Sequence, residues 1–109
     1  MSLQAFLKQP LPSGFVHETE AEKFRRQAKS VKKHFTTRAV RAADFNNPQG
    51  AENNNKKARL AEIAEHYSIE KIYLNVVVSI GNNTRINELV QGIDNLKEEY
   101  YNLQQELQI

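Results

Sequence analysis

The chain has 109 residues, enough for one helical core but too few for two independently stable ones. Hydrophobic residues make up 39% and charged residues 26%, a composition within the globular range. The absence of cysteine excludes disulfides, thiolate metal sites and cysteine nucleophiles. Without tryptophan and with few aromatic residues, the core has to be mainly aliphatic. This favours packed helices over a thick β-sandwich.

The formal net charge of +2 conceals an uneven distribution. Residues 1–59 contain 12 Lys/Arg and 5 Asp/Glu, a balance of +7, whereas residues 60–109 contain 3 and 8, a balance of −5. No apolar run approaches the roughly 18 residues of a membrane span, and the first residues lack the hydrophobic stretch of a secretory signal. We therefore expect a cytoplasmic protein with a basic half and an acidic half and no membrane contact.

The first segment, residues 1–18, is predicted to be a flexible arm. Leu3, Phe6 and Leu7 are spaced for a single amphipathic turn, and prolines and a glycine interrupt the chain soon afterwards. A basic amphipathic helix is expected over residues 19–46. It starts with a capping box of Thr19 and Glu22, which predicts an N-cap at Thr19. Its apolar stripe runs from Ala21 to Phe45.

Residues 52–80 are predicted to be helical but broken. The first part has an apolar side that includes Leu60, Ile63 and Tyr67, and the second has a stripe made of Ile69, Ile72, Tyr73, Val76 and Ile80. On one continuous helix the two stripes lie roughly 165° apart. Since one straight helix would have to bury both sides, a break capped by Ser68 is expected. Residues 69–80 are rich in β-branched side chains, so a strand, and an α+β fold, is the alternative.

The last helix, residues 84–108, is expected to begin at Thr84 and has the most regular pattern. Apolar residues alternate by three and four along it: Ile86, Leu89, Ile93, Leu96, Tyr100, Leu103 and Leu107. This heptad seam is typical of a coiled coil and predicts a homo-oligomer interface. The alternative is that the seam packs on the other helices of the same chain, in a small antiparallel bundle. The fold class expected is therefore all-α, as a single domain.

One side of the helix over residues 19–46 is basic, with the residues Arg25, Arg26, Lys29, Lys32 and Lys33. Several cations on one rigid rod can neutralise phosphates of DNA or RNA. Lys56, Lys57 and Arg59 would extend such a surface. The alternatives are an acidic protein partner, a solvated face, or a face paired with the acidic C-terminal half.

No pattern of catalytic or metal-binding residues is found. The sequence lacks a phosphate-binding glycine loop, a nucleophile elbow and the H-E-x-x-H zinc motif, and its three histidines are scattered. We expect no catalytic residue, metal, cofactor or small-molecule substrate. The sequence predicts a non-enzymatic assembly protein that self-associates through its last helix and binds an anionic partner, with nucleic acid first. The alternative is a structural adaptor or chaperone-like subunit that binds a protein helix through residues 69–80 and the arm around Phe6.

Overall fold

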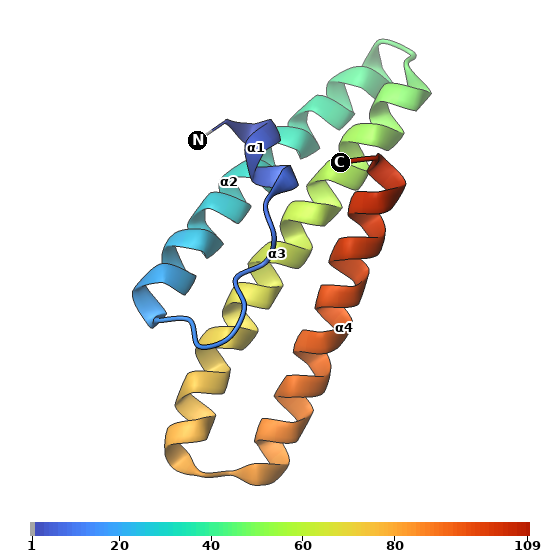
Figure 1. The fold of residues 1–109 in the computed structure, drawn as a ribbon. Coiled ribbons are helices and arrows are strands. Elements are labelled where there is room, and N and C mark those ends of the chain that lie inside the picture. The colour runs from blue at the N-terminus through green and yellow to red at the C-terminus, as the bar shows by residue number, and fades with distance from the viewer. Residues whose placement is uncertain (1) are drawn as a thin grey trace.

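The computed structural model describes residues 2–109 and contains four helices: α1 (Leu3–Lys8), α2 (Glu18–Asp44), α3 (Pro48–Ile80) and α4 (Asn83–Leu107). The long helices form an elongated bundle of 53 × 23 × 20 Å, and the chain reverses direction after α2 and again after α3 (Figure 1). The all-helical fold class is confirmed. Residues 69–80 are helical and the described residues contain no strand, so the strand alternative is wrong.

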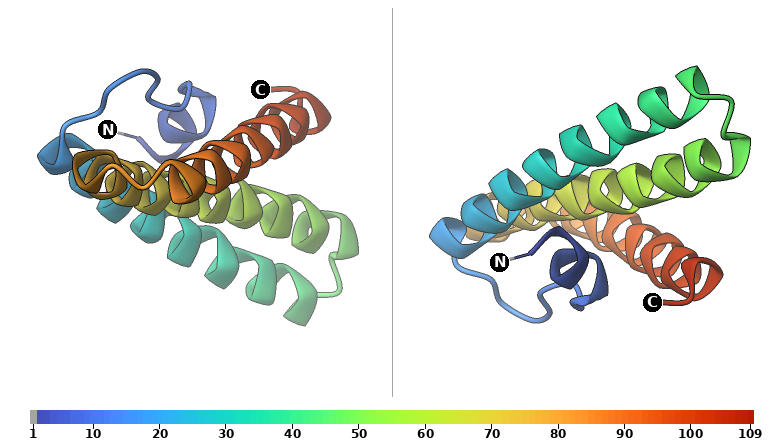
Figure 2. Two further views of the ribbon diagram at one scale, coloured as in Figure 1. Left: turned by 90° about the horizontal axis from the view of Figure 1, so that it is seen from below. Right: turned by 90° about the horizontal axis from the view of Figure 1, so that it is seen from above.

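The central element is α3, along which both α2 and α4 pack. The short helix α1 and the linker after it lie in the angle between α2 and α4, on one side of the bundle (Figure 2). All four helices contribute to one hydrophobic core. Its largest fully buried side chains are Phe6, Leu7, Phe35, Leu60, Ile63, Tyr67 and Tyr100.

The helix ends are set by side-chain caps that differ from the predicted ones. His17, not Thr19, caps α2, because its Nδ1 accepts a hydrogen bond from the Thr19 amide at 3.1 Å. Asn47 caps α3, so Pro48 occupies the first position of that helix instead of stopping the one before it. Asn82, not Thr84, caps α4. Gly81 ends α3 with φ of 81°, a left-handed conformation that favours glycine.

The N-terminal segment is ordered and packed, so the prediction of a flexible arm over residues 1–18 is wrong for the part that the structure describes (2–18). Phe6 is only 1% exposed, and Leu7, Leu11 and Val16 are also buried. The Phe6 ring stacks on Phe24 of α2, with the ring centroids 5.3 Å apart. The prolines interrupt helix formation as expected, but the apolar side chains before, between and after them still supply core surface.

Hydrogen bonds from α3 hold the linker between α1 and α2. Three side chains spaced four residues apart donate to alternate backbone carbonyls: Tyr67 to Pro12, Lys71 to Gly14 at 2.7 Å, and Asn75 to Val16 at 2.9 Å. Four residues of helix advance by about 6 Å, so the three donors stand in a row along α3, and the linker, which bends at Gly14 and Phe15, presents one carbonyl to each. The inward face of α3 therefore matches the carbonyls of the linker, and two polar residues belong to it.

This match explains why α3 is unbroken and why the prediction of a break at Ser68 is wrong. Ser68 is buried inside the helix, and its hydroxyl donates to the Ala64 carbonyl at 3.0 Å instead of capping a new element. The inward face continues past Tyr67 through Lys71, Leu74 and Asn75, of which only Leu74 is apolar. A break would leave backbone groups on both sides of it without partners.

The second apolar stripe consequently points away from the core. We call Ile69, Ile72, Tyr73, Val76 and Ile80 the outer stripe of α3. Tyr73 is 56% exposed, Val76 51% and Ile80 72%, while Ile69 and Ile72 are half-buried. The two apolar stripes of α3 therefore lie on different sides of one continuous helix, and only the first of them is buried.

Substitution of the two phenylalanines of the N-terminal segment tests its packing. We expect Phe6→Ala to lower the free energy of unfolding by about 3–5 kcal/mol, because it leaves a cavity in the core. Phe15→Ala should change it by less than about 0.5 kcal/mol, since Phe15 is 82% exposed. Urea unfolding followed by circular dichroism measures both. Equal, small effects would mean that the segment is a loose arm.

Alkaline pH should weaken the fold through the buried tyrosines. Burial raises the pKa of Tyr67 to about 12, and it also raises the pKa of Tyr100 above its usual value. Tyrosine side chains in the unfolded chain ionise near pH 10. The contribution of Tyr67 to the free energy of unfolding is therefore fully present below pH 10 and is lost as the pH rises toward 12. Unfolding measured between these values should lose part of its pH dependence in Tyr67→Phe. An unchanged slope in Tyr67→Phe would contradict this.

Candidate functional site

The five predicted basic residues lie on the solvent side and one flank of α2. Arg26, Lys29 and Lys33 are exposed, whereas Arg25 and Lys32 are half-buried beside the core face. Helical spacing places these residues because the buried positions Ala21, Phe24, Ala28, Val31, Phe35 and Ala39 fix the side of α2 that packs on the bundle. The cations are therefore carried on a rigid helix, and most of them face solvent.

Two of the five share a carboxylate. Arg25 donates to Glu22 through both Nε and a terminal nitrogen, and Arg26 Nε lies 3.5 Å from Glu22. The hydrogen bond from Arg25, together with the charges of the two arginines, lowers the pKa of Glu22. Within the described residues, Lys29, Lys32 and Lys33 make no ion pair. These three lysines are the cations of the predicted set that an external anion can use.

Three further cations of α2 are not among the predicted residues: Lys23, Arg38 and Arg41. They lie on the flank of the helix opposite to Arg25 and Lys32. They are exposed and unpaired in the described part of the chain. From residue 23 to residue 43, α2 contains no Asp or Glu, and its Lys/Arg residues are Lys23, Arg25, Arg26, Lys29, Lys32, Lys33, Arg38 and Arg41. Their span of 18 residues corresponds to about 27 Å of helix. The gap in acidic residues was visible in the sequence and would have identified the whole surface. We call these eight residues the basic surface of α2.

The predicted extension of this surface onto α3 is largely used inside the molecule. Lys56 lies 2.6 Å from Glu106, and Arg59 lies 2.5 Å from Glu99, so both are paired with α4. These hydrogen bonds raise the pKa of Lys56 and of Arg59. Lys57 lies over the Phe35 ring, 5.5 Å from its centroid. The acidic residues of α4 thus pair with cations of α3. The sequence suggests such a pairing for the cations of α2 instead.

The heptad seam of α4 packs within the chain. Leu89, Ile93 and Tyr100 are buried, Ile86 is half-buried, and Leu96, Leu103 and Leu107 pack partly buried against the core. This is the intramolecular alternative that the sequence left open. Self-association through the seam stays a prediction, and it would require these side chains to leave their present contacts.

Two polar residues of α4 fix it to the N-terminal segment. The Tyr100 hydroxyl donates to the Gln9 carbonyl at 2.8 Å, and the Gln104 amide donates to the Leu7 carbonyl at 2.8 Å. Gln104 is buried, and the sequence analysis gave it no role. The inner face of α4 therefore binds α1 and the residues after it through hydrogen bonds as well as apolar contacts.

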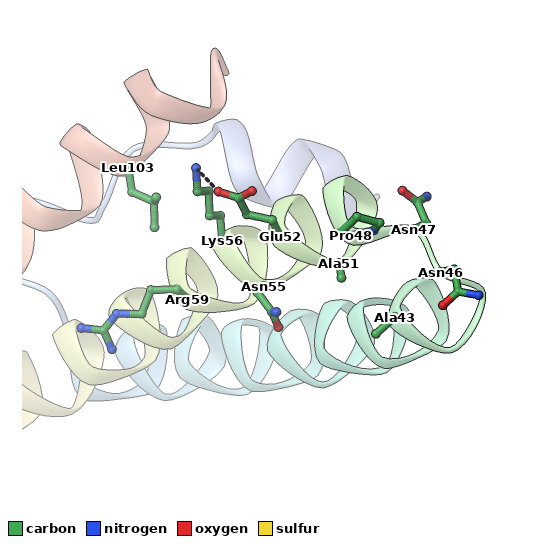
Figure 3. A pocket seen from close by; sticks show the side chains of 10 residues that line it. All are labelled: Ala43, Asn46, Asn47, Pro48, Ala51, Glu52, Asn55, Lys56, Arg59 and Leu103. Atoms are coloured by element: carbon green, nitrogen blue, oxygen red, sulfur yellow. Dashed lines mark ion pairs between the residues drawn. The ribbon is translucent and has the colours of Figure 1, made fainter.

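A surface pocket lies where the end of the α2–α3 hairpin meets α4. Figure 3 shows its lining, in which asparagines of the turn and of α3 surround Glu52 and Lys56, with Leu103 reaching in from α4. Glu52 and Lys56 are paired with each other at 3.4 Å, and Arg59 is held by Glu99. The lining contains no histidine, serine or threonine. Each charged side chain of the pocket is held in an ion pair, so the pocket gives no basis for proposing a reaction.

Two further searches of residues 2–109 gave no site. No helix there is both long enough and apolar enough to span a bilayer. No group of three or more His, Asp or Glu side chains is arranged to hold a metal ion in that range. Comparison of the chain with protein-family models, with curated proteins and with solved structures found no match.

Proposed function

We propose that this chain is a non-enzymatic interaction protein that binds nucleic acid along the basic surface of α2. The observation that supports the proposal is a run of eight cations over about 27 Å of exposed helix, interrupted by no carboxylate. Duplex DNA carries one charge per about 1.7 Å of its axis. Arg25 and Arg26 share Glu22, and the other six cations make no ion pair among the described residues. Those on the solvent side of the helix can contact several phosphates together.

Recognition of this kind uses the phosphate backbone. Lys and Arg side chains contact phosphates without reading bases, so affinity depends on the nucleic acid's charge and hardly on its sequence. Phe24 and Phe35 within the run are buried and face the core, and the half-buried His34 ring packs edge-on against Phe35, with centroids 5.1 Å apart. The proposed activity is therefore sequence-independent binding that weakens steeply with salt.

Binding to a generic DNA duplex and to a single-stranded RNA, titrated with salt, tests the proposal. We expect binding at low salt, and we expect the double variant Lys29→Glu/Lys33→Glu to abolish it. Each single substitution should reduce the slope of log affinity against log salt concentration by about one unit. Fluorescence anisotropy measures both. These two lysines are exposed and unpaired, so the variant should remain folded.

The matched control changes the net charge by the same amount elsewhere. Lys8→Glu/Lys97→Glu removes one cation from α1 and one from α4, and it should retain most of the binding. Equal loss in both variants would show that only the total charge matters. No binding at low salt would refute the proposal, and preferential binding of polyglutamate would favour an acidic protein partner.

The second candidate is the structural adaptor that binds a protein partner. The exposed outer stripe of α3 favours it, because contiguous exposed apolar surface marks interaction sites. The predicted contribution of Phe6 to such a surface is wrong, since Phe6 is buried against Phe24. The adaptor would therefore have to work through α3 alone.

A further inference from the structure

The outer stripe of α3 is an apolar surface that the described chain leaves exposed at Tyr73, Val76 and Ile80 and covers only in part at Ile69 and Ile72. In Figure 1 the lower part of α3 and the start of α4 extend past the first turn of α2, so α2 does not reach the end of the stripe. The linker is bound on another side of α3, through Lys71 and Asn75. Tyr73, Val76 and Ile80 are each more than half exposed. Such a stripe on a rigid helix is a docking face.

The spacing of the stripe is symmetric about its own midpoint. Reversing the helix about the point between Leu74 and Asn75 places position 69 on position 80, position 73 on position 76, and position 72 on position 77. All six of these positions carry apolar residues: Ile69, Ile72, Tyr73, Val76, Val77 and Ile80. When two such helices run in opposite directions, Ile69 lies opposite Ile80 of the other copy and the large Tyr73 ring opposite the smaller Val76, with Ile72 and Val77 at the two edges of the contact.

The charges at the two ends of the stripe are complementary under the same rotation. Glu70 lies at the Ile69 end, beyond which α3 also carries Glu65 and Glu62. The other end is followed by uncharged residues and then by Arg85, at the start of α4 on the same side as Glu70, where both line one surface pocket. Arg85 is exposed and is paired with Glu88 at 3.0 Å, a surface contact within α4 that a second carboxylate can share. Two helices running in opposite directions bring Glu70 toward Arg85 of the other copy. Two helices running in the same direction would place like charges together.

We propose that a second copy of this chain covers the outer stripe, with the two α3 helices running in opposite directions across a two-fold axis. Such an interface is isologous, the commonest arrangement among soluble oligomers. The stripe spans 12 residues, about 17 Å of helix, which is small for a stable dimer. The dimer therefore forms with a strong dependence on concentration. It leaves the heptad seam of α4 in its intramolecular contacts.

Light scattering and sedimentation over micromolar to millimolar protein test the interface. The mass should rise with concentration from the 12.5 kDa of one chain toward twice that value. Val76→Glu buries an unpaired charge in the interface, so it should weaken dimerisation by at least about tenfold. The matched control is Val40→Glu on α2, which should leave dimerisation unchanged. The side chain of Val40 is 57% exposed, close to the 51% of Val76. Circular dichroism of both variants checks that they fold.

Charge reversal tests the direction of the two helices. Glu70→Arg and Arg85→Glu should each weaken dimerisation, and the double variant should restore it, because the pair is rebuilt with its signs exchanged. A double variant that remains as weak as the single ones would overturn the opposite-running arrangement.

Two results would overturn the interface itself. A monomer at every concentration would do so, and it would leave the stripe to a partner from another protein. A dimer that Val76→Glu does not weaken would also do so, because the contact would then lie elsewhere, for example on the seam of α4.

Discussion

The hydrogen bonds between α3 and the linker are the constraint on which the arrangement of the molecule depends. Tyr67, Lys71 and Asn75 stand in a row along the helix and reach three alternate backbone carbonyls of the linker. Burial lowers the pKa of Lys71. Its ammonium is nevertheless held by the Gly14 carbonyl and lies 5.8 Å from the centre of the Tyr67 ring. These contacts keep α1 in the angle between α2 and α4, where Tyr100 and Gln104 of α4 bind it from the other side.

The same constraint determines what the molecule exposes. Because the inward face of α3 is committed to the core and to the linker along most of its length, the helix continues unbroken through Ser68. The outer stripe is then turned to solvent. On α2, the core positions similarly turn the basic surface outward. Two surfaces of different chemistry result, a cationic one on α2 and an apolar one on α3, and they suit different partners.

The sequence predicts the elements well where one physical signal dominates. The stripe of α2 and the heptad seam of α4 give the right helices, because apolar spacing decides which side is buried. It fails where polar residues face inward. Lys71 and Asn75 interrupt the apolar pattern of α3 although they belong to its inner face, so the pattern predicts a break and the burial of a stripe that the structure exposes. In the N-terminal segment the prolines predict a loose arm, whereas Phe6 and Leu11 are buried.

For the candidate site, the five basic residues could be located from the sequence, but their partners could not. Arg25 and Arg26 share Glu22, within one helix turn. The pairing of Lys56 with Glu106 joins residues 50 positions apart and requires α4 to lie beside α3. A sequence gives the charge of such residues, and only the fold shows which charges remain available to an external partner.

The most direct test of the account is a distance along α3. The chain has no cysteine, so spin labels can be placed at Asn53 and Ser79, both exposed, by substitution with cysteine. An unbroken helix of 26 residue steps predicts a narrow distribution of backbone separations near 39 Å, measured by pulsed electron resonance. A shorter and broader distribution would show a break near Ser68. It would contradict both the row of hydrogen bonds from α3 to the linker and the exposure of the outer stripe.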